Sequence, residues 1–465
     1  PILDCQHDAV EDALPCGQFP LEQCLSGTCS CTPDCVDKQC GPDGCGGTCG
    51  QCGPDQVCIS GVCPAEGFQC DDGNNVPWDG CTYGQVTEYV LVECEECTEP
   101  AVAIRQDGVA VVTWSQKILG DGATQEFDVF AQLFSEAGLP ISSVIAVSTS
   151  NDGYQGNPDV AFLSGDGFVV VWDSSQESVS LDGDGGAVLA QRFDGQGEAE
   201  GSEFVVNQTT TGDQREPTVI VVPSGEVLFA WSDYSGGYGS GNVRGRVYSE
   251  SFVQVTGENQ WSPTNLNGQE TRPRMHLASN GDTILSWGGT SIGLIGLQRV
   301  SATGELVGDN GYLLDTQGFF GNSLAVDAVG NIVVVWDHFQ IGKKHEIRGQ
   351  ALHPWLAADG EALILSDDPE TQQYSPRVVS TGIDQFFVLW SGNSSGIGDG
   401  LLMRGFNPSD GTVEEISLVS DVHPVMNHSN LSLSLMQDGE FIAVWSCSAG
   451  LCAQRFDAEG SRVYR

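Results

Sequence analysis

The chain has few basic residues. Of its 465 residues, lysine and arginine together number 18, against 63 aspartates and glutamates, so the formal net charge is −45. Proteins bind nucleic acids and anionic membranes through lysine and arginine near phosphate, and a surface this acidic repels both. We therefore expect no nucleic-acid partner, and we expect charge to keep the protein soluble and to attract cations.

Long hydrophobic runs are also lacking. No apolar stretch approaches the roughly 18–20 residues that a helix needs to cross a bilayer, so we expect no membrane insertion. The chain begins at Pro1 and has no signal peptide. We interpret it as a mature exported protein whose targeting segment has been removed, with a truncated chain as the alternative.

Cysteine, by contrast, is abundant. Sixteen of the 18 cysteines lie between Cys5 and Cys97, and the other two are Cys447 and Cys452. An even number of cysteines in a short segment rich in glycine and proline predicts disulfides in an oxidising compartment. Zinc is the competing interpretation, but this segment contains one histidine, His7, and its CxxC pairs lack the usual spacing of a zinc site.

Glycine is abundant too, at 60 residues, and it punctuates an internal repeat. Residues 165–173 read GDGFVVVWD, a turn followed by an apolar run that ends in tryptophan. Six other segments have this form, and their tryptophans follow one another at intervals of 49 to 59 residues. The repeated tryptophans are Trp114, Trp172, Trp231, Trp287, Trp336, Trp390 and Trp445. Four short strands joined by glycine turns fill an interval without helical periodicity, which is typical of a β-propeller blade.

We therefore predict an all-β protein, a seven-bladed β-propeller preceded by a small disulfide-rich N-terminal region. The predicted domains are a cysteine-rich module at 1–64, a short disulfide repeat with a linker at 65–86, and the propeller at 87–465. Within the propeller, 87–93 is expected to be the closing strand of the last blade, which would remove two exposed sheet edges. Each repeated tryptophan is expected in the core between adjacent blades, because the inner strands of a propeller are buried on both faces.

Two disulfides are expected near the seam of the ring. Cys447 and Cys452 would bridge the second and third strands of the last blade. Cys94 and Cys97 flank the entry to the propeller, so they would either pair with each other or pin the N-terminal region to the ring. The spacing of the remaining cysteines does not determine their connectivity.

Several segments resemble known bacterial modules. The stretches DGDGGAVLAQRFDGQGEAEG and AQRFDAEG resemble a tryptophan-containing repeat of bacterial surface and secreted proteins. Residues 35–63 and the segment CDDGNNVPWDGC at 70–81 resemble disulfide modules in secreted proteins of myxobacteria and related deltaproteobacteria. The resemblance implies a secreted or cell-surface bacterial protein and counts Cys70 and Cys81 among the disulfide cysteines. It implies no reaction, because propellers support many functions.

Two groups of residues are candidate ligands. A glutamine recurs shortly before a proline where one blade leads to the next, which predicts a rim of amides at one mouth of the ring. These glutamines are Gln155, Gln214, Gln269 and Gln373. The alternative, which we favour, is that each caps the backbone of its own turn. A second group has oxygen ligands spaced as for calcium, namely Asp182, Asp184, Asp71, Asp72, Asn74 and Asp79. Ordinary Asp-Gly turns are the alternative there.

No catalytic constellation stands out, so the leading prediction is not an enzyme. We predict non-enzymatic recognition or adhesion, in which propeller loops bind a glycan or an extracellular protein. A second possibility is a structural or decorating subunit of an extracellular assembly, docked to a partner subunit through the cysteine-rich region. A third is a glycan-active hydrolase or lyase. Calcium is the one cofactor considered.

Overall fold

The structure is a computed structural model that divides the chain into two compact units, residues 1–87 and 88–463. It describes residues 89–118, 126–149, 153–175, 182–237, 241–262, 270–289, 293–315, 321–338, 345–366, 372–394, 398–420, 425, 431–436 and 439–463, and the backbone of four short strands before them. In the described part of the first unit, β1 (Glu22–Leu25) pairs with β2 (Thr28–Cys31), and β3 (Cys81–Thr82) pairs with β4 (Gln85–Val86).

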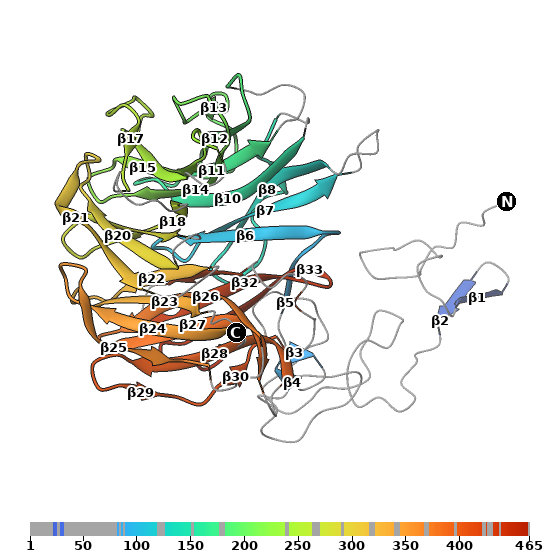
Figure 1. Ribbon diagram of the computed structural model, residues 1–465. Helices are drawn as coiled ribbons and strands as arrows, with labels where there is room; N and C mark the ends of the chain where they lie inside the picture. Colours follow the sequence, from blue (N-terminus) through green and yellow to red (C-terminus); the bar gives the residue numbers. More distant parts are fainter. Residues whose placement is uncertain are drawn as a thin grey trace. The chain divides into compact units, whose positions relative to one another are not determined.

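The second unit is built from β-strands (Figure 1). In chain order they are β5 (Tyr89–Glu93), β6 (Cys97–Ile104), β7 (Ala110–Ile118), β8 (Glu126–Phe134), β9 (Ile145–Ala146), β10 (Tyr154–Phe162), β11 (Phe168–Ser175), β12 (Gly186–Phe193), β13 (Phe204–Val205), β14 (Gln214–Val221), β15 (Val227–Asp233), β16 (Asn242–Tyr248), β17 (Asn259–Gln260), β18 (Glu270–Leu277), β19 (Thr283–Gly289), β20 (Leu294–Val300), β21 (Leu306–Asp315), β22 (Asn322–Val326), β23 (Ile332–His338), β24 (Glu346–Leu352), β25 (Ala358–Ile364), β26 (Gln373–Gly382), β27 (Gln385–Ser394), β28 (Gly398–Asn407), β29 (Thr412–Val413), β30 (Ser417–Leu418), β31 (Leu431–Leu435), β32 (Phe441–Cys447) and β33 (Gly450–Phe456). Within the described residues, no helix is long and apolar enough to cross a membrane.

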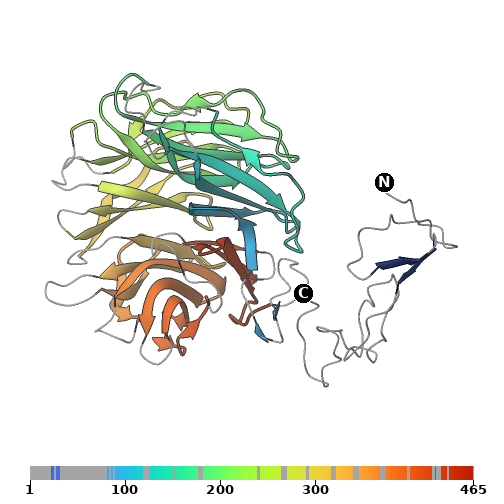
Figure 2. The same ribbon diagram turned by 90° about the vertical axis from the view of Figure 1, so that its right-hand side faces the viewer.

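These strands form a β-propeller whose sheets surround a common centre (Figures 1 and 2). In the described residues, five sheets are separate blades of four or five strands, and the first eight strands after β5 form one larger sheet. The predicted number of seven separate blades is therefore wrong. The first two repeat units are joined because Tyr154 of β10 pairs in parallel with Phe127 of β8. This single pairing joins the strands of the two units into one sheet.

The first strand of each repeat unit lines the centre. The strands β6, β10, β14, β18, β22, β26 and β31 each contact the next, and β31 contacts β6. In Figure 1 the outer strands β13, β17, β21, β25 and β29 lie at the periphery. At the seam, β5 from the start of the unit pairs antiparallel with β33 from its end, so the two ends of the propeller share one sheet.

The repeated tryptophans form the core between sheets. All seven are buried, with at most 3% of their surface exposed. Each lies on the second strand of its unit, where an apolar run such as VVVW packs on both faces. Gly296 on the neighbouring strand makes room for Trp287, because a Cβ at that position would lie 2.1 Å from the indole Cε2. By area alone, burying one such side chain favours folding by about 4–6 kcal/mol.

Two disulfides are present in the described part of the second unit. Cys94 bonds to Cys97, the first residue of β6, and Cys447 at the end of β32 bonds to Cys452 of β33. Both lie at the seam, since Gly450, the first residue of β33, pairs with Glu93 of β5. The bridges therefore reinforce the place where the ring closes.

Candidate active site

A cavity of about 490 Å³ lies at the centre of the propeller. Its walls are the first strands of the repeat units and the residues just before them. This volume is within the usual range for a small-molecule site.

The mouth is lined by residues that stand immediately before a proline and have left-handed backbone geometry. They are Glu99 (φ 55°), Asn157 (φ 49°), Glu216 (φ 56°), Arg272 (φ 55°) and Ser375 (φ 51°). At each, the pairing of the first and second strands shifts by one residue, as at a β-bulge. A non-glycine residue in this geometry costs about 1–3 kcal/mol, so the surrounding packing must impose it. The bulge re-aims one side chain per unit toward the mouth.

On one side of the mouth, the carboxylates of Glu99 and Glu216 each accept hydrogen bonds from a backbone N–H of the next unit and from a tyrosine hydroxyl. Oε2 of Glu99 accepts hydrogen bonds from the backbone N–H of Asn157 (2.7 Å) and the hydroxyl of Tyr154 (3.1 Å). Oε2 of Glu216 accepts from the backbone N–H of Arg272 (3.1 Å) and lies 3.4 Å from the Tyr234 hydroxyl. The two glutamates thus have similar partners, although Tyr154 belongs to the unit after Glu99 and Tyr234 belongs to the same unit as Glu216.

Each glutamate also has a serine partner in its own unit. Ser115 donates to Glu99 at 3.2 Å, and Ser232 donates to Glu216 at 2.8 Å. Burial, with the neighbouring Glu99 and Glu216 carboxylates as further causes, raises the pKa values of the Tyr154 and Tyr234 phenols respectively. Both phenols therefore stay protonated and act as hydrogen-bond donors at neutral pH.

Asp173 connects the two glutamates. Its Oδ2 accepts from the side-chain amide of Asn157 (2.9 Å) and from the backbone N–H of Glu216 (2.7 Å). Burial raises the pKa of Asp173 to about 7, and the nearby charges of Glu99 and Glu216 add to this effect. This carboxyl therefore changes charge near neutral pH while it holds the backbone of the rim.

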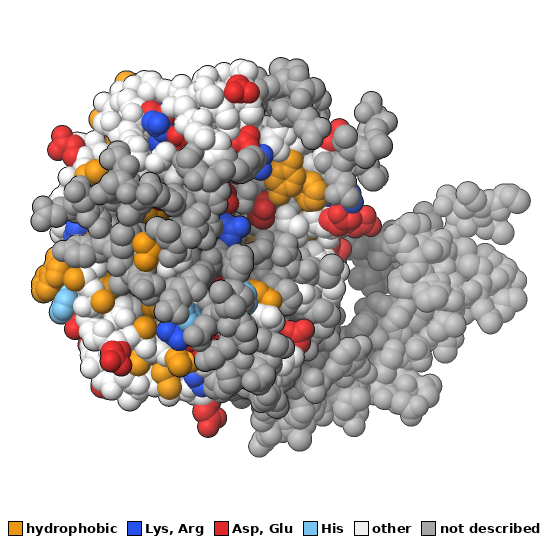
Figure 3. Space-filling model, viewed as in Figure 1, with side chains coloured by type: hydrophobic (Ala, Val, Ile, Leu, Met, Phe, Trp, Pro, Cys, Tyr) orange, Lys and Arg blue, Asp and Glu red, His pale blue; other side chains and the backbone are white. Residues whose placement is uncertain are grey.

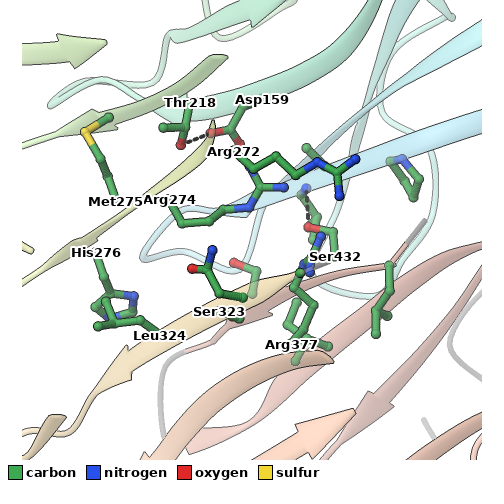
Figure 4. Close-up of a pocket in the computed structure, with 18 of the residues that line it drawn as sticks. Asp159, Thr218, Arg272, Arg274, Met275, His276, Ser323, Leu324, Arg377 and Ser432 are labelled. Atoms are coloured by element: carbon green, nitrogen blue, oxygen red, sulfur yellow. Dashed lines mark hydrogen bonds between the residues drawn. The ribbon is translucent and has the colours of Figure 1, made fainter. Parts of the chain in front are cut away.

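Below the mouth, the first strands contribute one layer of residues to the cavity, and the charge of these residues differs from unit to unit. Seven residues pair with the residue that precedes the repeated tryptophan, namely Ala101, Asp159, Thr218, Arg274, Ser323, Arg377 and Ser432. Asp159 accepts from the Thr218 hydroxyl (2.7 Å) and the Val219 N–H (2.9 Å). Burial raises the pKa of Asp159. Arg274 and Arg377 lie further around the same layer, on either side of Ser323 (Figure 4).

Three arginines thus share one side of the cavity. Arg272 is at the mouth, half-exposed, with Nε 3.2 Å from Oε1 of Glu216. Arg274 and Arg377 lie deeper, and all three side chains project into the same space in Figure 4. Burial, together with the charges of Arg274 and Arg272, lowers the pKa of Arg377 to about 9. His276, deeper still, has its pKa lowered to about 4 by burial, so its ring is neutral at neutral pH.

The predicted rim glutamines lie elsewhere. Gln155, Gln214 and Gln373 are buried, with at most 1% exposed. Gln155 and Gln373 accept hydrogen bonds from the indole N–H groups of Trp172 (3.1 Å) and Trp390 (2.5 Å). Gln214 donates to the Thr211 carbonyl (3.0 Å) within its own turn. Gln269 lies outside the described residues. These amides support the repeat from inside and do not line the cavity.

The predicted calcium ligands are only partly described. Oδ2 of Asp182 accepts from the Asn207 amide (2.6 Å), and Oδ2 of Asp184 accepts from the Gly212 N–H (3.2 Å), so both carboxylates support loops. Asp71, Asp72, Asn74 and Asp79 lie outside the described residues, as do Cys70 and the side chain of Cys81. Among the residues that are described, no group of three or more His, Cys, Asp or Glu side chains could hold a metal ion.

The residues that line the cavity were not singled out from the sequence. Their signal is the residue directly before a recurring proline, at Pro100, Pro158, Pro217, Pro273 and Pro376. The repeat keeps the proline but changes the residue before it, from Glu to Asn, Arg or Ser. A repeat protein can build a binding site by varying the side chain at one position of each repeat while the backbone stays the same.

No family model and no curated protein sequence matches the chain. Among solved structures, the chain is similar to the NanB sialidase from Streptococcus pneumoniae, with 9% identity, coverage of 70% of this chain and 71% of that one, and a TM-score of 0.49. It is similar to the polysaccharide lyase Uly1, with 11% identity, 83% and 98% coverage, and a TM-score of 0.49. For a Penicillium chrysogenum alpha-L-arabinanase the values are 13%, 81% and 99%, and 0.45.

These structures are glycan-active enzymes, which contradicts the predicted non-enzymatic recognition function and the prediction that the chain is not an enzyme. At these identities and TM-scores, however, the similarities carry no argument about this chain's own chemistry.

Proposed function

We propose that the protein is a glycan-active enzyme, a hydrolase or lyase, with its active site at the mouth of the propeller cavity. The observation that carries this proposal is the presence of two carboxylates, Glu99 and Glu216, in equivalent positions at that mouth. Each is partly exposed to the cavity and fixed by a tyrosine hydroxyl and a backbone N–H. Cleavage of a glycosidic bond commonly uses two such carboxyl groups.

In hydrolysis the two carboxyl groups would divide the work. The protonated one gives its proton to the glycosidic oxygen as the bond between that oxygen and the anomeric carbon breaks. The ionised one takes a proton from the water whose oxygen bonds to the anomeric carbon. We assign the ionised role to Glu216, because the Arg272 guanidinium lies beside it. Glu99 is the second carboxyl group of the pair, and it accepts hydrogen bonds from Ser115, Tyr154 and the N–H of Asn157.

In elimination the same mouth would act differently. A base removes the proton next to a sugar carboxylate, the glycosidic oxygen leaves, and a carbon–carbon double bond forms. A hydrolase releases a reducing end without unsaturation, whereas a lyase releases a product with new ultraviolet absorbance. One assay that follows both signals separates the two reactions.

The test is turnover on a panel of neutral and acidic polysaccharides, with the full-length oxidised chain. We expect activity on at least one glycan, and a loss of about 10²–10⁴-fold in kcat for Glu99→Gln and for Glu216→Gln. Glu96→Gln is the matched control, because Glu96 also has a positive φ (50°) but pairs with Lys117. No turnover on any glycan, or equal loss in all three variants, would reject the proposal.

We also propose that the protein acts outside the cell, secreted or on a bacterial surface. The two disulfides at the seam, Cys94–Cys97 and Cys447–Cys452, support this, because such bonds persist in oxidising compartments. An extracellular glycan is then an accessible substrate. Fractionation of the producing bacterium, with detection of the chain in medium, envelope and cytoplasm, tests the location.

A further inference from the structure

A third layer of residues lies two positions further along each first strand than the layer of Asp159 and Arg274. Its members are Ala103, Ala161, Ile220, His276, Ala325, Val379 and Ser434. None of them is charged at neutral pH, since the His276 ring is neutral. On the described part of the face in Figure 3, by contrast, charged side chains of both signs are scattered among uncharged ones. The third layer therefore differs from the outer surface and from the layer above it.

His276 is exposed to the cavity from this layer. Its side chain is partly accessible and lines the cavity together with Leu324 (Figure 4). Among the residues that the structure describes, the imidazole has no partner in a hydrogen bond or an ion pair. Neither ring nitrogen is completely enclosed, so both are open to the cavity. Polar groups inside proteins are nearly always hydrogen-bonded, so water or a ligand has to supply the partners of His276.

The neutral imidazole favours a hydroxyl group as that partner. It offers one N–H donor and one nitrogen acceptor, and a hydroxyl can pair with either. A carboxylate could pair with the donor alone, and an ammonium group with the acceptor alone. The neighbouring lining residues Met275, Leu324 and Val379 are apolar, so a charge placed beside them would be poorly solvated.

The formal charges that line the rest of the cavity balance. The lining includes three carboxylates and three guanidinium groups, from Glu99, Asp159, Glu216, Arg272, Arg274 and Arg377. Opposite charges act on one another there, since Arg272 pairs with Glu216 and the charge of Asp159 raises the pKa of Arg274 against the larger effect of burial. A balanced cavity in a chain with a net charge of −45 favours an uncharged ligand over an ion.

We propose that His276 is a specificity-determining residue that hydrogen-bonds a hydroxyl group of an uncharged sugar residue deep in the cavity. The inference rests on the proposed function for the word substrate, but the binding that it describes does not depend on turnover. His276 lies four residues beyond Arg272 on β18, about 13 Å along the strand. A glycan end held by His276 therefore extends toward the mouth, where Glu99 and Glu216 lie.

The experiment is calorimetric titration of the full oxidised chain with the methyl glycosides of glucose, galactose, xylose, arabinose and N-acetylglucosamine. Methyl glucuronide and methyl glucosaminide are the negatively and positively charged probes. We expect at least one uncharged glycoside to bind, and both charged probes to bind at least about 10-fold more weakly than it. Preferred binding of a charged probe would overturn the assignment to an uncharged sugar.

Variants connect the binding to His276. His276→Phe keeps a ring but loses both nitrogens, so it should weaken the bound glycoside by about 10-fold. His276→Asn should recover part of the loss, because its amide keeps a donor and an acceptor. His353→Phe is the matched control and should bind as wild type does, since His353 is absent from the cavity lining and stacks on Trp355. Thermal unfolding of each variant confirms folding.

Deoxy analogues of the bound glycoside separate recognition from a structural role. Each analogue lacks one hydroxyl group. We expect one of them to bind wild type about 10-fold more weakly than the parent glycoside, and to bind His276→Phe as well as the parent does, because the missing groups are partners. If His276→Phe weakened the parent and every analogue by the same factor, the hydroxyl contact would be rejected.

The outcomes also separate this inference from the proposed function. Binding that depends on His276, without turnover on any glycan, would retain the specificity residue and reject the enzyme. Turnover with unchanged kcat and KM in His276→Phe would retain the enzyme and reject the specificity residue. The absence of binding by all five uncharged glycosides, or equal binding by wild type and His276→Phe, would overturn the inference as well.

Discussion

The backbone N–H of Glu216 donates a 2.7 Å hydrogen bond to Oδ2 of Asp173. Asp173 follows Trp172 in one repeat unit, and Glu216 is the left-handed residue at the mouth of the next. The backbone N–H groups of Asn157 and Arg272 likewise donate to the preceding unit, to the mouth residues Glu99 and Glu216 respectively. The backbone of Asn157, Glu216 and Arg272 is therefore fixed by the unit beside each, so the packing of neighbouring units determines the geometry at these positions.

Replacing Asp173 tests this relation. Asp173→Ala removes the acceptor for two N–H groups, and we expect a loss of about 1–3 kcal/mol in the free energy of unfolding. Asp173→Asn keeps an oxygen in the same place, so its loss should be below about 1 kcal/mol. Urea unfolding, followed by tryptophan fluorescence at pH 7, measures both. If the alanine and asparagine variants were equally stable, the carboxyl oxygen would not be holding the rim.

Glu270 gives a prediction for pH. It occupies the register position that Gln155, Gln214 and Gln373 occupy in other units, and it is buried beside Ser262, whose hydrogen bond only partly offsets the effect of burial on the Glu270 pKa. Burial raises the pKa of Glu270 to about 7, above its ordinary value of 4.5. Because the pKa is raised in the folded state, burial of the neutral Glu270 carboxyl leaves stability intact below pH 4.5. That stability is lost as the pH rises through 7, where the buried carboxyl becomes charged.

Glu270→Gln should therefore be more stable than wild type at pH 8 by up to about 3 kcal/mol, and equally stable at pH 4. The difference should develop between pH 4.5 and 7. Unfolding free energies at a series of pH values measure it. Glu136→Gln, at an exposed position, should show no such divergence, and a Glu270→Gln curve parallel to wild type would contradict the assignment.

Much of the fold could be predicted from local sequence. An apolar run such as FVVVW between glycine turns has no solvated face, so it has to be an inner strand, and Trp172 within it is buried. The number of separate sheets could not be predicted, because one parallel pairing between Tyr154 and Phe127 decides it. Both residues lie at the beginning of their strands, where register depends on tertiary packing and leaves no periodic signal.

The site was harder to predict than the fold. Arg274 and Arg377 are 103 positions apart, and only the order of strands around the ring brings them to one cavity. The recurring glutamines were more visible because they follow the repeat, yet Gln155 and Gln373 serve the tryptophans inside the sheets. The residues that recur in each repeat, such as these glutamines, have structural roles. The residues before the recurring prolines differ from repeat to repeat, and these line the cavity.

The disulfide between Cys447 and Cys452 should stabilise the seam. It closes a loop with a sequence separation of 5, for which chain entropy gives about 2 kcal/mol. We expect the double variant Cys447→Ser, Cys452→Ser to unfold with a free energy lower by that amount. A Cβ at Gly450 would lie 3.1 Å from Sγ of Cys94, so the two bridges are neighbours. Loss of both should therefore be non-additive in a double-mutant cycle, and additive losses would show that the bridges act independently.

The repeated tryptophans are predicted to differ in how well they tolerate phenylalanine. The Trp172 indole N–H donates to the buried oxygen of Gln155 at 3.1 Å, whereas the indole nitrogen of Trp445 is buried without a hydrogen-bond partner in the described residues. Both substitutions remove similar apolar volume, but Trp172→Phe also deprives Gln155 of a donor, and Trp445→Phe removes a buried N–H that has no acceptor. We expect Trp172→Phe to destabilise the propeller by about 1–3 kcal/mol more than Trp445→Phe, measured by urea unfolding under identical conditions. Equal losses would mean that packing alone determines the role of these tryptophans.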